Sequence, residues 1–403
     1  MTMKLPQLSP KQSLKGKKIF LRVDWNVPLS GLAPEDSLKV SRSIETIKDL
    51  SKRGAIVILA TYLGRPKGRD MSLSTKILQN LVAKQYKLRM TFLGMELDTP
   101  KGLLEAQNLV ADAKDGDIFL LENVRFASGE EKNSPSLAKA YASLADMFVN
   151  DAFSICHRAH ASIVGVAKLL PKYAGPHLVE EVEALQRVIT KPKKPFVAIV
   201  GGAKISTKVG VLEALLAVAD SVFVGGAMAN AFFAAQKREI GTSYVEKEGI
   251  PIAKKLLKHK NLYLPVDLVV AKKIAKDVHP RASEIAEVKK SEAIGDIGPR
   301  TMQLWSSEIR KAETIVWNGP VGVTEIPAFS HGSLVLGKAI AMRSKGAAYG
   351  IVGGGDTLPV AIATGMSEWI DHLSTGGGAM LEFIASKGKL PGLMALAGAS
   401  KKK

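Results

Sequence analysis

The chain has 403 residues, of which 46% are hydrophobic and 23% charged, so its composition is that of a globular protein with apolar residues enough for two or more domains. A single cysteine excludes an internal disulfide framework, and no apolar run approaches the roughly 20 residues of a transmembrane helix. The formal net charge of +18 attracts anions without specifying them, so nucleic acid, an anionic membrane and phosphorylated metabolites all stay open as partners.

The first residues are polar and basic, and they lack the apolar stretch of a secretory signal. Together with the lone Cys156, this predicts a cytoplasmic protein in a reducing compartment. Lysine clusters at residues 191–194, 254–260 and 401–403 are interpreted as solvated surface and a frayed tail.

Short apolar runs alternate with helical patterns along the chain. The runs show little polar alternation, as strands buried on both faces should. We predict strands at residues 18–23, 55–60, 89–93, 117–121 and 147–149 in the first half, and at 196–200, 221–224, 262–270, 314–317 and 348–352 in the second. The helical patterns between them include residues 73–85, 136–144, 209–219 and 305–311. Strands alternating with helices predict right-handed crossovers and parallel sheets.

A helical stretch at residues 177–189 is followed by the polar, proline-containing sequence TKPKKP, and a new apolar strand then begins. We place the domain boundary here. The predicted fold class is α/β, with two doubly wound parallel-sheet (Rossmann-like) domains at residues 1–176 and 195–390. A hinge helix and linker at residues 177–194 would join them.

Charged side chains follow the predicted strands of the first half. Arg65, Arg125 and Arg158 each come shortly after a strand, and Asp24 and Asn26 follow the first one. Carboxyl ends of parallel strands share one sheet edge, where ligands bind, and arginine forks match phosphate and carboxylate oxygens. A single arginine there is more simply a surface ion pair, but the group favours a small phosphorylated acid as ligand.

Glycine-rich loops follow the strands of the second half, at residues 201–208, 225–228, 318–322, 353–357 and 374–379. Glycine lets backbone N–H groups approach phosphate, and five such loops exceed what tight turns alone need. Lys204 and Lys208 are predicted to share one face of a helix start, where they could meet nucleotide phosphates. Asp356 is open to two interpretations, a helix N-cap or a Mg²⁺ ligand. Neither a Walker A motif nor GxGxxG is present.

An arginine-rich acid pocket on one domain and a glycine-rich nucleotide pocket on the other fit phosphoryl transfer, which needs positioning and charge neutralisation. Ligands on separate domains would require hinge closure to meet and exclude water. His157 and His160 lack a third metal ligand nearby and are interpreted as structural or anion-contacting residues. A basic nucleic-acid-binding protein is the alternative class, but no aromatic-basic motif supports it.

The sequence resembles the phosphoglycerate kinase family from residue 17 to about residue 396, in motifs such as LRVDWNVPL, YLGRPKG, VGGAKISTKVGV, VWNGPVGV, VGGGDT and STGGGAMLE. The resemblance implies a hinge-bending enzyme that reversibly makes ATP and 3-phosphoglycerate from ADP and 1,3-bisphosphoglycerate in glycolysis. It further implies a monomer whose tail, residues 391–403, folds back on the first domain, with no nucleic-acid or membrane partner.

The resemblance also assigns residues by motif. Implied contacts of the acid substrate are Asp24, Trp25, Asn26, Lys39, Tyr62, Leu63, Gly64, Arg65, Arg125 and Arg158. Implied catalytic residues are Lys39, Lys204, Lys208, Gly376 and Gly377. Implied nucleotide contacts, bound as MgADP or MgATP, are Lys208, Gly226, Asn318, Glu325, Gly354, Gly355, Asp356 and Thr357, with Asp356 as the Mg²⁺ ligand.

Some positions depart from the family pattern. Lys39 stands where the family has an arginine, Tyr62 where it has a histidine before LGRP, and Ala127 where it has a histidine after ENxRF. Lysine keeps the charge but loses the fork. These departures motivate an alternative, a divergent member with an altered acyl-phosphate substrate or low turnover.

Overall fold

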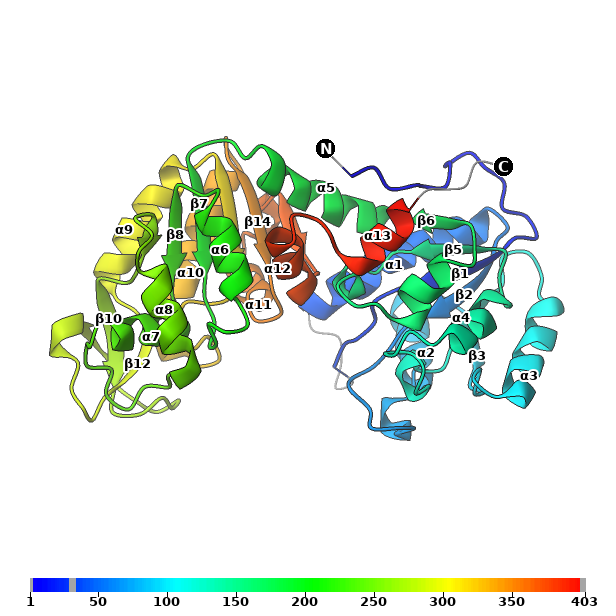
Figure 1. Cartoon of the computed structure of the whole chain (residues 1–403), viewed down its shortest axis with the longest axis horizontal. Coiled ribbons are helices and arrows are strands. Elements are labelled where there is room, and N and C mark those ends of the chain that lie inside the picture. Colours follow the sequence, from blue (N-terminus) through cyan, green and yellow to red (C-terminus); the bar gives the residue numbers. More distant parts are fainter. Residues whose placement is uncertain (1–2, 29–33, 399–403) are drawn as a thin grey trace. The chain divides into compact units, whose positions relative to one another are not determined.

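The computed structural model describes residues 3–28 and 34–398, and the chain divides into two compact units (Figure 1). Unit 1 runs to Glu183 and takes in the segment from Gly388 on, whereas unit 2 is Ala184–Lys387. The division falls inside helix α5 (Pro176–Thr190), within the stretch expected to link two domains. Residues 399–403 of the expected C-terminal tail lie outside the described residues.

Unit 1 is built on a parallel sheet in the order β3-β4-β2-β1-β5-β6. Its strands are β1 (Lys18–Arg22), β2 (Ile56–Ala60), β3 (Thr91–Leu93), β4 (Ile118–Leu121), β5 (Met147–Asn150) and β6 (Lys172–Ala174). Its helices, besides α5, are α1 (Pro34–Lys52), α2 (Lys76–Tyr86), α3 (Pro100–Ala111), α4 (Pro135–Ala142) and α13 (Pro391–Ala397).

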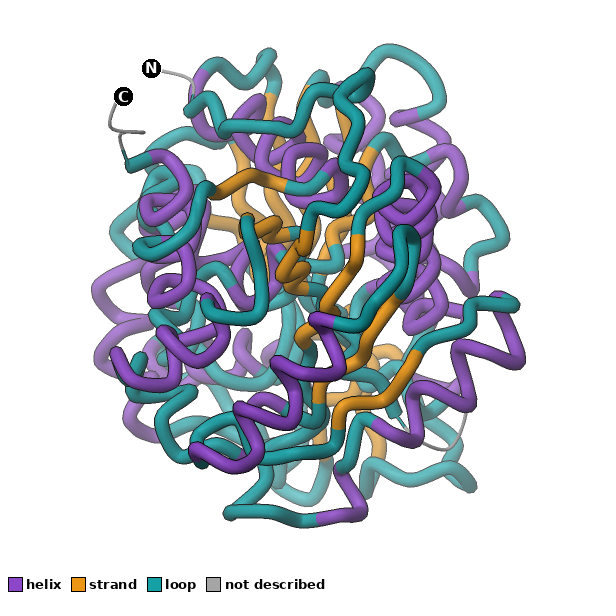
Figure 2. Tube along the Cα trace, turned by 90° about the vertical axis from the view of Figure 1, so that its right-hand side faces the viewer, coloured by secondary structure: helices purple, strands orange, loops and turns teal. Residues whose placement is uncertain are grey.

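Unit 2 is built on a second parallel sheet in the order β15-β14-β13-β7-β8-β9. Its strands are β7 (Phe196–Val200), β8 (Ser221–Val224), β9 (Leu262–Tyr263), β13 (Thr314–Asn318), β14 (Tyr349–Gly353) and β15 (His372–Ser374). Its helices are α6 (Val209–Leu216), α7 (Met228–Ala235), α8 (Ile250–Leu256), α9 (Pro299–Lys311), α10 (His331–Ser344), α11 (Leu358–Ala363) and α12 (Gly378–Ala385). Figure 2 shows strands running between helices on both sides, as the prediction of doubly wound sheets requires.

A small antiparallel sheet of β10 (Asp267–Ala271), β11 (Arg281–Glu284) and β12 (Ala293–Ile297) was not predicted. The single strand predicted at residues 262–270 is wrong, because the chain leaves the parallel sheet after Tyr263 and enters this second sheet at Asp267. Pro265 lies between the two and lacks the N–H that a continuous ladder would need.

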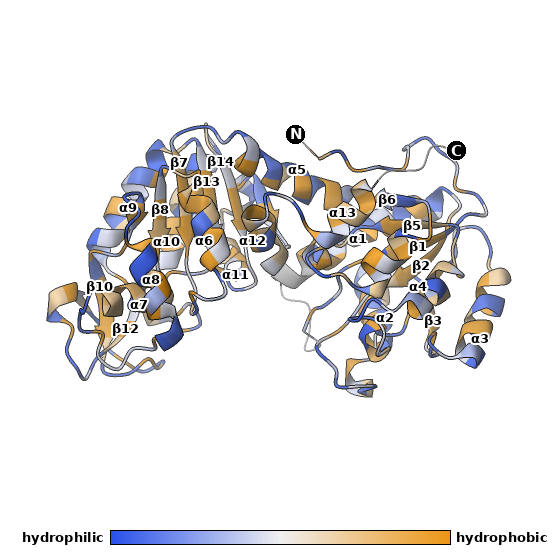
Figure 3. Ribbon diagram, viewed as in Figure 1, coloured by the Kyte–Doolittle hydropathy of each residue, from blue (hydrophilic) through white to orange (hydrophobic). Residues whose placement is uncertain are grey.

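Each unit has its own apolar core. The central strands β2 and β7 read IVILA and FVAIV and are buried along their whole length, which is why they show no alternation. Helix α1 packs on β2 with Val40, Ile44 and Ile47 in the core of unit 1, and Trp305 and Trp317 anchor the core of unit 2. Figure 3 shows these sheet strands mostly in the hydrophobic colour.

The strand orders locate the ligand-binding edges. In unit 1 the crossovers change direction between neighbouring strands β1 and β5, and in unit 2 they do so between β7 and β13. Ligands of doubly wound sheets bind beyond the carboxyl ends of the strands at such switch points. The loops after these four strands are therefore the ones to examine.

Candidate active site

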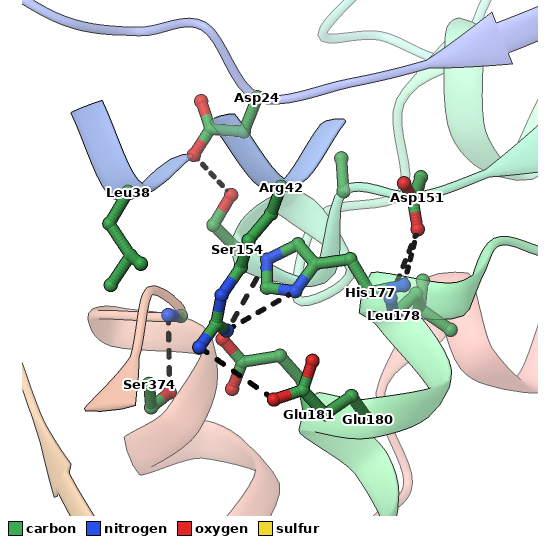
Figure 4. A network of polar contacts seen from close by, with 12 residues as sticks. Asp24, Leu38, Arg42, Asp151, Ser154, His177, Leu178, Glu180, Glu181 and Ser374 are labelled. Carbon is green, nitrogen blue, oxygen red and sulfur yellow. Dashed lines mark hydrogen bonds and ion pairs between the residues drawn. The ribbon is translucent and has the colours of Figure 1, made fainter. Parts of the chain in front are cut away.

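The loops after β1 and β5 meet at Asp24. Its carboxylate accepts hydrogen bonds from the backbone N–H of Asn26, at 3.1 Å, and from the hydroxyl of Ser154, the latter visible in Figure 4. Trp25 is fully buried and its indole N–H donates to Ser43 of α1 at 2.7 Å, so its side chain has a packing role. The sequence therefore turns alternate residues after β1 toward the sheet edge and toward the core.

The loop after β2 is fixed in place by three polar side chains from neighbouring loops. The Asn26 carbonyl oxygen accepts from the N–H of Gly64 at 2.8 Å, and the Asn123 amide donates to the carbonyl of Leu63 at 2.9 Å. Arg125 donates to the carbonyl of Gly64 at 2.6 Å. Gly64 has φ +59°, and Leu73 lies 3.1 Å from where a Cβ would be, so the loop requires glycine here.

Tyr62 holds two of the predicted acid-binding residues at once. The Arg125 guanidinium carbon lies 4.0 Å from the centroid of its ring, and that of Arg22 lies 5.3 Å from it. The Tyr62 hydroxyl also interacts with the side chain of Asn26. Burial, reinforced by the Asp24 carboxylate, raises the pKa of Tyr62 above its usual range, so the phenol stays neutral.

The other predicted acid-binding residues are less engaged. Arg65 and Arg158 are exposed, and Lys39 on α1 is half-buried. Among the described residues, no hydrogen bond or ion pair is found for the side chains of Lys39 and Arg65. One turn along α1, Arg42 lies 3.7 Å from the Glu180 carboxylate and 3.4 Å from the His177 ring of α5 (Figure 4).

A buried polar network supports this edge from behind. Arg22, 1% exposed, donates through Nε to Ser162 at 3.0 Å, and Ser162 donates to the Glu130 carboxylate at 2.6 Å. His160 lies 3.7 Å from the same carboxylate. Burial lowers the pKa of His160 to about 4, and the nearby charges of Arg22, Arg125 and Arg158 act in the same direction. Three arginines are thus close enough to act on one imidazole.

In unit 2, Lys208 spans the switch point between β7 and β13. Its ammonium donates to the carbonyl of Gly201 at 2.6 Å and to the side-chain carbonyl of Asn318 at 2.9 Å. Burial lowers the pKa of Lys208 to about 8, and the Asp356 carboxylate acts in the opposite direction. A largely desolvated ammonium at this edge is a strong attractor for an anion.

The predicted sharing of a helix face by Lys204 and Lys208 is wrong. Helix α6 begins only at Val209, and residues 204–208 form a turn that precedes it. Lys204 is exposed, whereas Lys208 points back to the sheet. The reason is that Gly201 and Gly202 extend the loop, with Gly202 at φ +110°.

The glycine loops of unit 2 surround a cavity at the carboxyl ends of the strands. This cavity, of about 170 Å³, is lined by Lys208, Asn318, Gly319, Gly354, Gly355, Asp356, Thr357, Gly377, Gly378 and Leu381. A Cβ added at Gly355, Gly377 or Gly378 would meet no atom within 4 Å, so these backbones face open space. Gly376 is buried and its N–H donates to Ser374 at 3.2 Å (Figure 4).

A second cavity of about 180 Å³ adjoins these loops. Its walls include the backbones of Gly202, Gly226 and Gly322 and the apolar side chains of Val321 and Leu268, and the exposed Glu325 lies at its margin. Asp356 lines both cavities, so they are contiguous at this residue. An apolar slot that leads to glycine loops and an ammonium matches the base and phosphates of a nucleotide.

Asp356 does not cap a helix. The N-cap of α11 is Thr357, whose hydroxyl accepts instead from the N–H of Gly319 at 2.7 Å. The Asp356 carboxylate is exposed beside the glycine loop. Of its two interpretations, only the ligand role stays open. The part of the chain that is described contains no group of three or more His, Cys, Asp or Glu side chains suited to a metal.

Sequence reasoning missed the buried polar residues of both units. Arg22, Glu130 and Ser162 read as parts of a strand and a loop, and Asn230 as one residue in a helical pattern. Asp296, 2% exposed, lines the slot of unit 2 and accepts from the N–H groups of Gly332 and Ile297. Burial raises its pKa to about 7. A polar residue inside an otherwise apolar run was the only available signal.

The fold and the two clusters are those of a phosphotransferase of the two-unit α/β type. A family model for phosphoglycerate kinase matches residues 10–387. Curated phosphoglycerate kinases from Thermus thermophilus and Dictyoglomus turgidum are 42% and 41% identical to this chain, over 95% and 96% of its length and 98% and 96% of theirs.

Solved structures agree. Phosphoglycerate kinases from Coxiella burnetii and Pyrococcus horikoshii superpose with TM-scores of 0.81 and 0.82, at 38% and 29% identity, each covering 96% of this chain and 97% of the other. The chain belongs to the phosphoglycerate kinase family. Its activity is that of a phosphoglycerate kinase of glycolysis, EC 2.7.2.3, and it binds ATP. Within the described residues, no helix is long and apolar enough to cross a membrane.

Proposed function

We propose that unit 1 binds 3-phosphoglycerate or 1,3-bisphosphoglycerate and that unit 2 binds ADP or ATP. The observation that carries the proposal is the contrast between the two switch points. Arginines and hydroxyl-binding groups surround the loops after β1 and β5, whereas glycine backbone and one buried ammonium surround those after β7 and β13. Arginine forks suit a carboxylate and a terminal phosphate, and glycine N–H groups suit a polyphosphate.

In unit 1, Asp24 and Asn26 would bind substrate hydroxyl and phosphate oxygens, and Arg65, Arg125 and Arg158 would neutralise the acid. The fixed loop of residues 62–64 supports this assignment, because it aligns Arg125 through both its ring stack and its carbonyl. Leu63, 1% exposed, would contribute through the backbone.

In unit 2, the base would lie in the apolar slot beside Gly226, the ribose near Glu325, and the phosphates over residues 354–357. Asn318 and Lys208 would meet the phosphate chain where they already pair with each other. Magnesium fits Asp356, since Mg²⁺ in nucleotide sites takes one or two carboxylates and completes its shell with phosphate oxygens and water. When bound, it would neutralise phosphate charge.

The reaction breaks the bond between phosphorus and the acyl oxygen of 1,3-bisphosphoglycerate and forms one to a β-phosphate oxygen of ADP. The electron pair stays with the carboxylate of 3-phosphoglycerate, so no proton transfer is needed. Lys208 and the backbone at Gly376 and Gly377 would stabilise the charge of the transferring group. Lys204 and Lys39 are further candidates for this charge. Because the two ligands must meet, the proposal includes closure of the hinge expected from the sequence.

We further propose that the protein acts in the cytoplasm as a monomer. The absence of a membrane-spanning helix among the described residues is consistent with this. The net charge of +18 would then serve anionic metabolites rather than nucleic acid.

Replacement of Lys39 tests the role of α1. If Lys39 contacts the transferring phosphoryl, Lys39→Ala lowers kcat by about 10²-fold or more in an assay that follows ATP formation from 1,3-bisphosphoglycerate and MgADP. Arg42→Ala is the matched comparison, since Arg42 is engaged with Glu180 and His177. An unchanged kcat in Lys39→Ala, with a loss in Arg42→Ala, would assign the role to Arg42 instead.

A further inference from the structure

A buried acceptor in unit 2 has no partner. Asn230, on α7, is 1% exposed, and its amide nitrogen donates to the carbonyl of Tyr244 at 2.8 Å. Its side-chain oxygen Oδ1 makes no hydrogen bond to any described residue. Because the nitrogen must face a carbonyl, the amide cannot be flipped without opposing two acceptors, and the orientation of Oδ1 is fixed. Burying an acceptor without a partner is costly, so such a group calls for one.

Asn230 lies where two cavities meet. It lines the apolar slot of about 180 Å³ in which we place the nucleotide base, and also a neighbouring cavity of about 470 Å³ that is walled in part by Thr242, Ser243 and Tyr244. The nearest hydroxyl of that second cavity is already used. Ser243 donates to the carbonyl of Ile240 and accepts from the N–H of Ile294 at 2.9 Å. A donor for Oδ1 must therefore come from what enters the cavities.

The slot otherwise offers a base few directional contacts. Beside Asn230, its inner wall consists of the apolar groups of Ala229, Phe233, Leu268 and Ile294. Such surfaces accept any purine, because every base has an apolar face. A lone acceptor in an apolar wall is different, because it rewards a donor and repels another acceptor. The group at position 6 separates the purines in this way: adenine carries an amino donor there, and hypoxanthine and guanine carry an oxo acceptor.

We propose that Oδ1 of Asn230 accepts a hydrogen bond from the 6-amino group of the nucleotide base and thereby selects adenine nucleotides over 6-oxopurine nucleotides. The inference rests on the proposed placement of the nucleotide in unit 2. It names a specificity-determining residue of the known reaction. A water molecule bound to Oδ1 is the competing explanation, and it predicts no discrimination by the group at position 6.

The test compares three diphosphates as phosphoryl acceptors in the ATP-forming direction. ADP carries the amino group, the diphosphate of purine riboside carries hydrogen at position 6, and IDP carries an oxo group. We expect kcat/KM to fall by about 10-fold or more from ADP to the purine riboside diphosphate, and further to IDP. In Asn230→Leu, which removes the acceptor with little change in size, the three values should converge to within about 3-fold. Tyr244→Phe is the matched control, because it alters only the neighbouring cavity and keeps the backbone carbonyl that holds Asn230; it should preserve the wild-type order.

Equal kcat/KM for the three diphosphates with the wild-type enzyme would overturn the proposal, and so would an unchanged order in Asn230→Leu. If Asn230→Leu does not fold, the wild-type series alone decides. Failure of the nucleotide placement itself is recognised separately by Asp356→Asn. If that change leaves the KM for MgADP unaltered, the nucleotide is not bound at these loops. If it raises the KM while the three diphosphates react equally, only the role of Asn230 is wrong.

Discussion

At the scale of single residues, Lys208 makes a pH prediction. Its pKa of about 8 means that the ammonium is charged below that pH and neutral above it. Because kcat/KM reports groups of the free enzyme, kcat/KM for MgADP should fall as the pH rises through about 8. In Lys208→Arg the guanidinium stays charged, so this falling limb should disappear from the residual activity. The same limb in both proteins would mean that another group titrates.

Tyr62 should act on the acid substrate alone. Its ring fixes Arg125 at 4.0 Å, and a cation–π contact at a partly desolvated site contributes about 1–2 kcal/mol. Tyr62→Leu should therefore raise the KM for 1,3-bisphosphoglycerate by roughly 5- to 30-fold, whereas Tyr62→Phe, which keeps the ring, should change it by less than about 3-fold. The KM for MgADP should not move in either variant. An equal effect of both changes would assign the role to the hydroxyl and Asn26.

At the scale of elements, α13 is held in unit 1 by a few buried contacts. Leu393 and Leu396 are 0% and 1% exposed, and the N–H of Gly392 donates to the carbonyl of Cys156 at 2.8 Å. Leu393→Ala should lower the free energy of unfolding by about 2–5 kcal/mol in urea titrations. Met394 is 50% exposed, and Met394→Ala should change it by less than about 0.5 kcal/mol. A loss as small in Leu393→Ala as in Met394→Ala would mean that α13 adds little stability.

Most central elements could be predicted because their signal is local. Strands β7 and β8 begin and end at the predicted residues, since both are uninterrupted apolar runs. The antiparallel sheet could not be predicted in this way. Its strand β11 reads RASE, with two exposed residues, and is stabilised by pairing with β10 rather than by its own pattern.

The candidate sites divide similarly. Glycine loops and strand-end arginines could be recognised from the sequence, because their chemistry and their place after a strand are both visible in it. The partners of these residues could not. That Tyr62 stacks on Arg125 and that Lys208 reaches Asn318, which is 110 positions further along the chain, depend on strand order, which periodicity does not reveal. The fixed, unpartnered Oδ1 of Asn230 is visible only once α7 is folded against the loop at Tyr244.

At the scale of the whole molecule, the account rests on a division of labour between two units with separate cores. Each unit offers one kind of anion-binding surface at one switch point, so a change on one unit should affect one ligand. Long-range attraction from the net charge of +18 would help both ligands alike and would be screened by salt, so it cannot produce such selectivity.

Calorimetric titration of 3-phosphoglycerate and MgADP into two single variants tests this claim most directly. Arg158→Met should weaken 3-phosphoglycerate binding by about 10-fold or more and leave MgADP within about 2-fold, because hydrogen bonds to charged groups contribute about 1.5–3 kcal/mol. Asp356→Asn should do the reverse. The exposed residues Arg89 and Asp277 supply matched controls, Arg89→Met and Asp277→Asn, which should alter neither affinity. Loss of MgADP binding in Arg158→Met, or of 3-phosphoglycerate binding in Asp356→Asn, would contradict the assignment of one ligand to each unit.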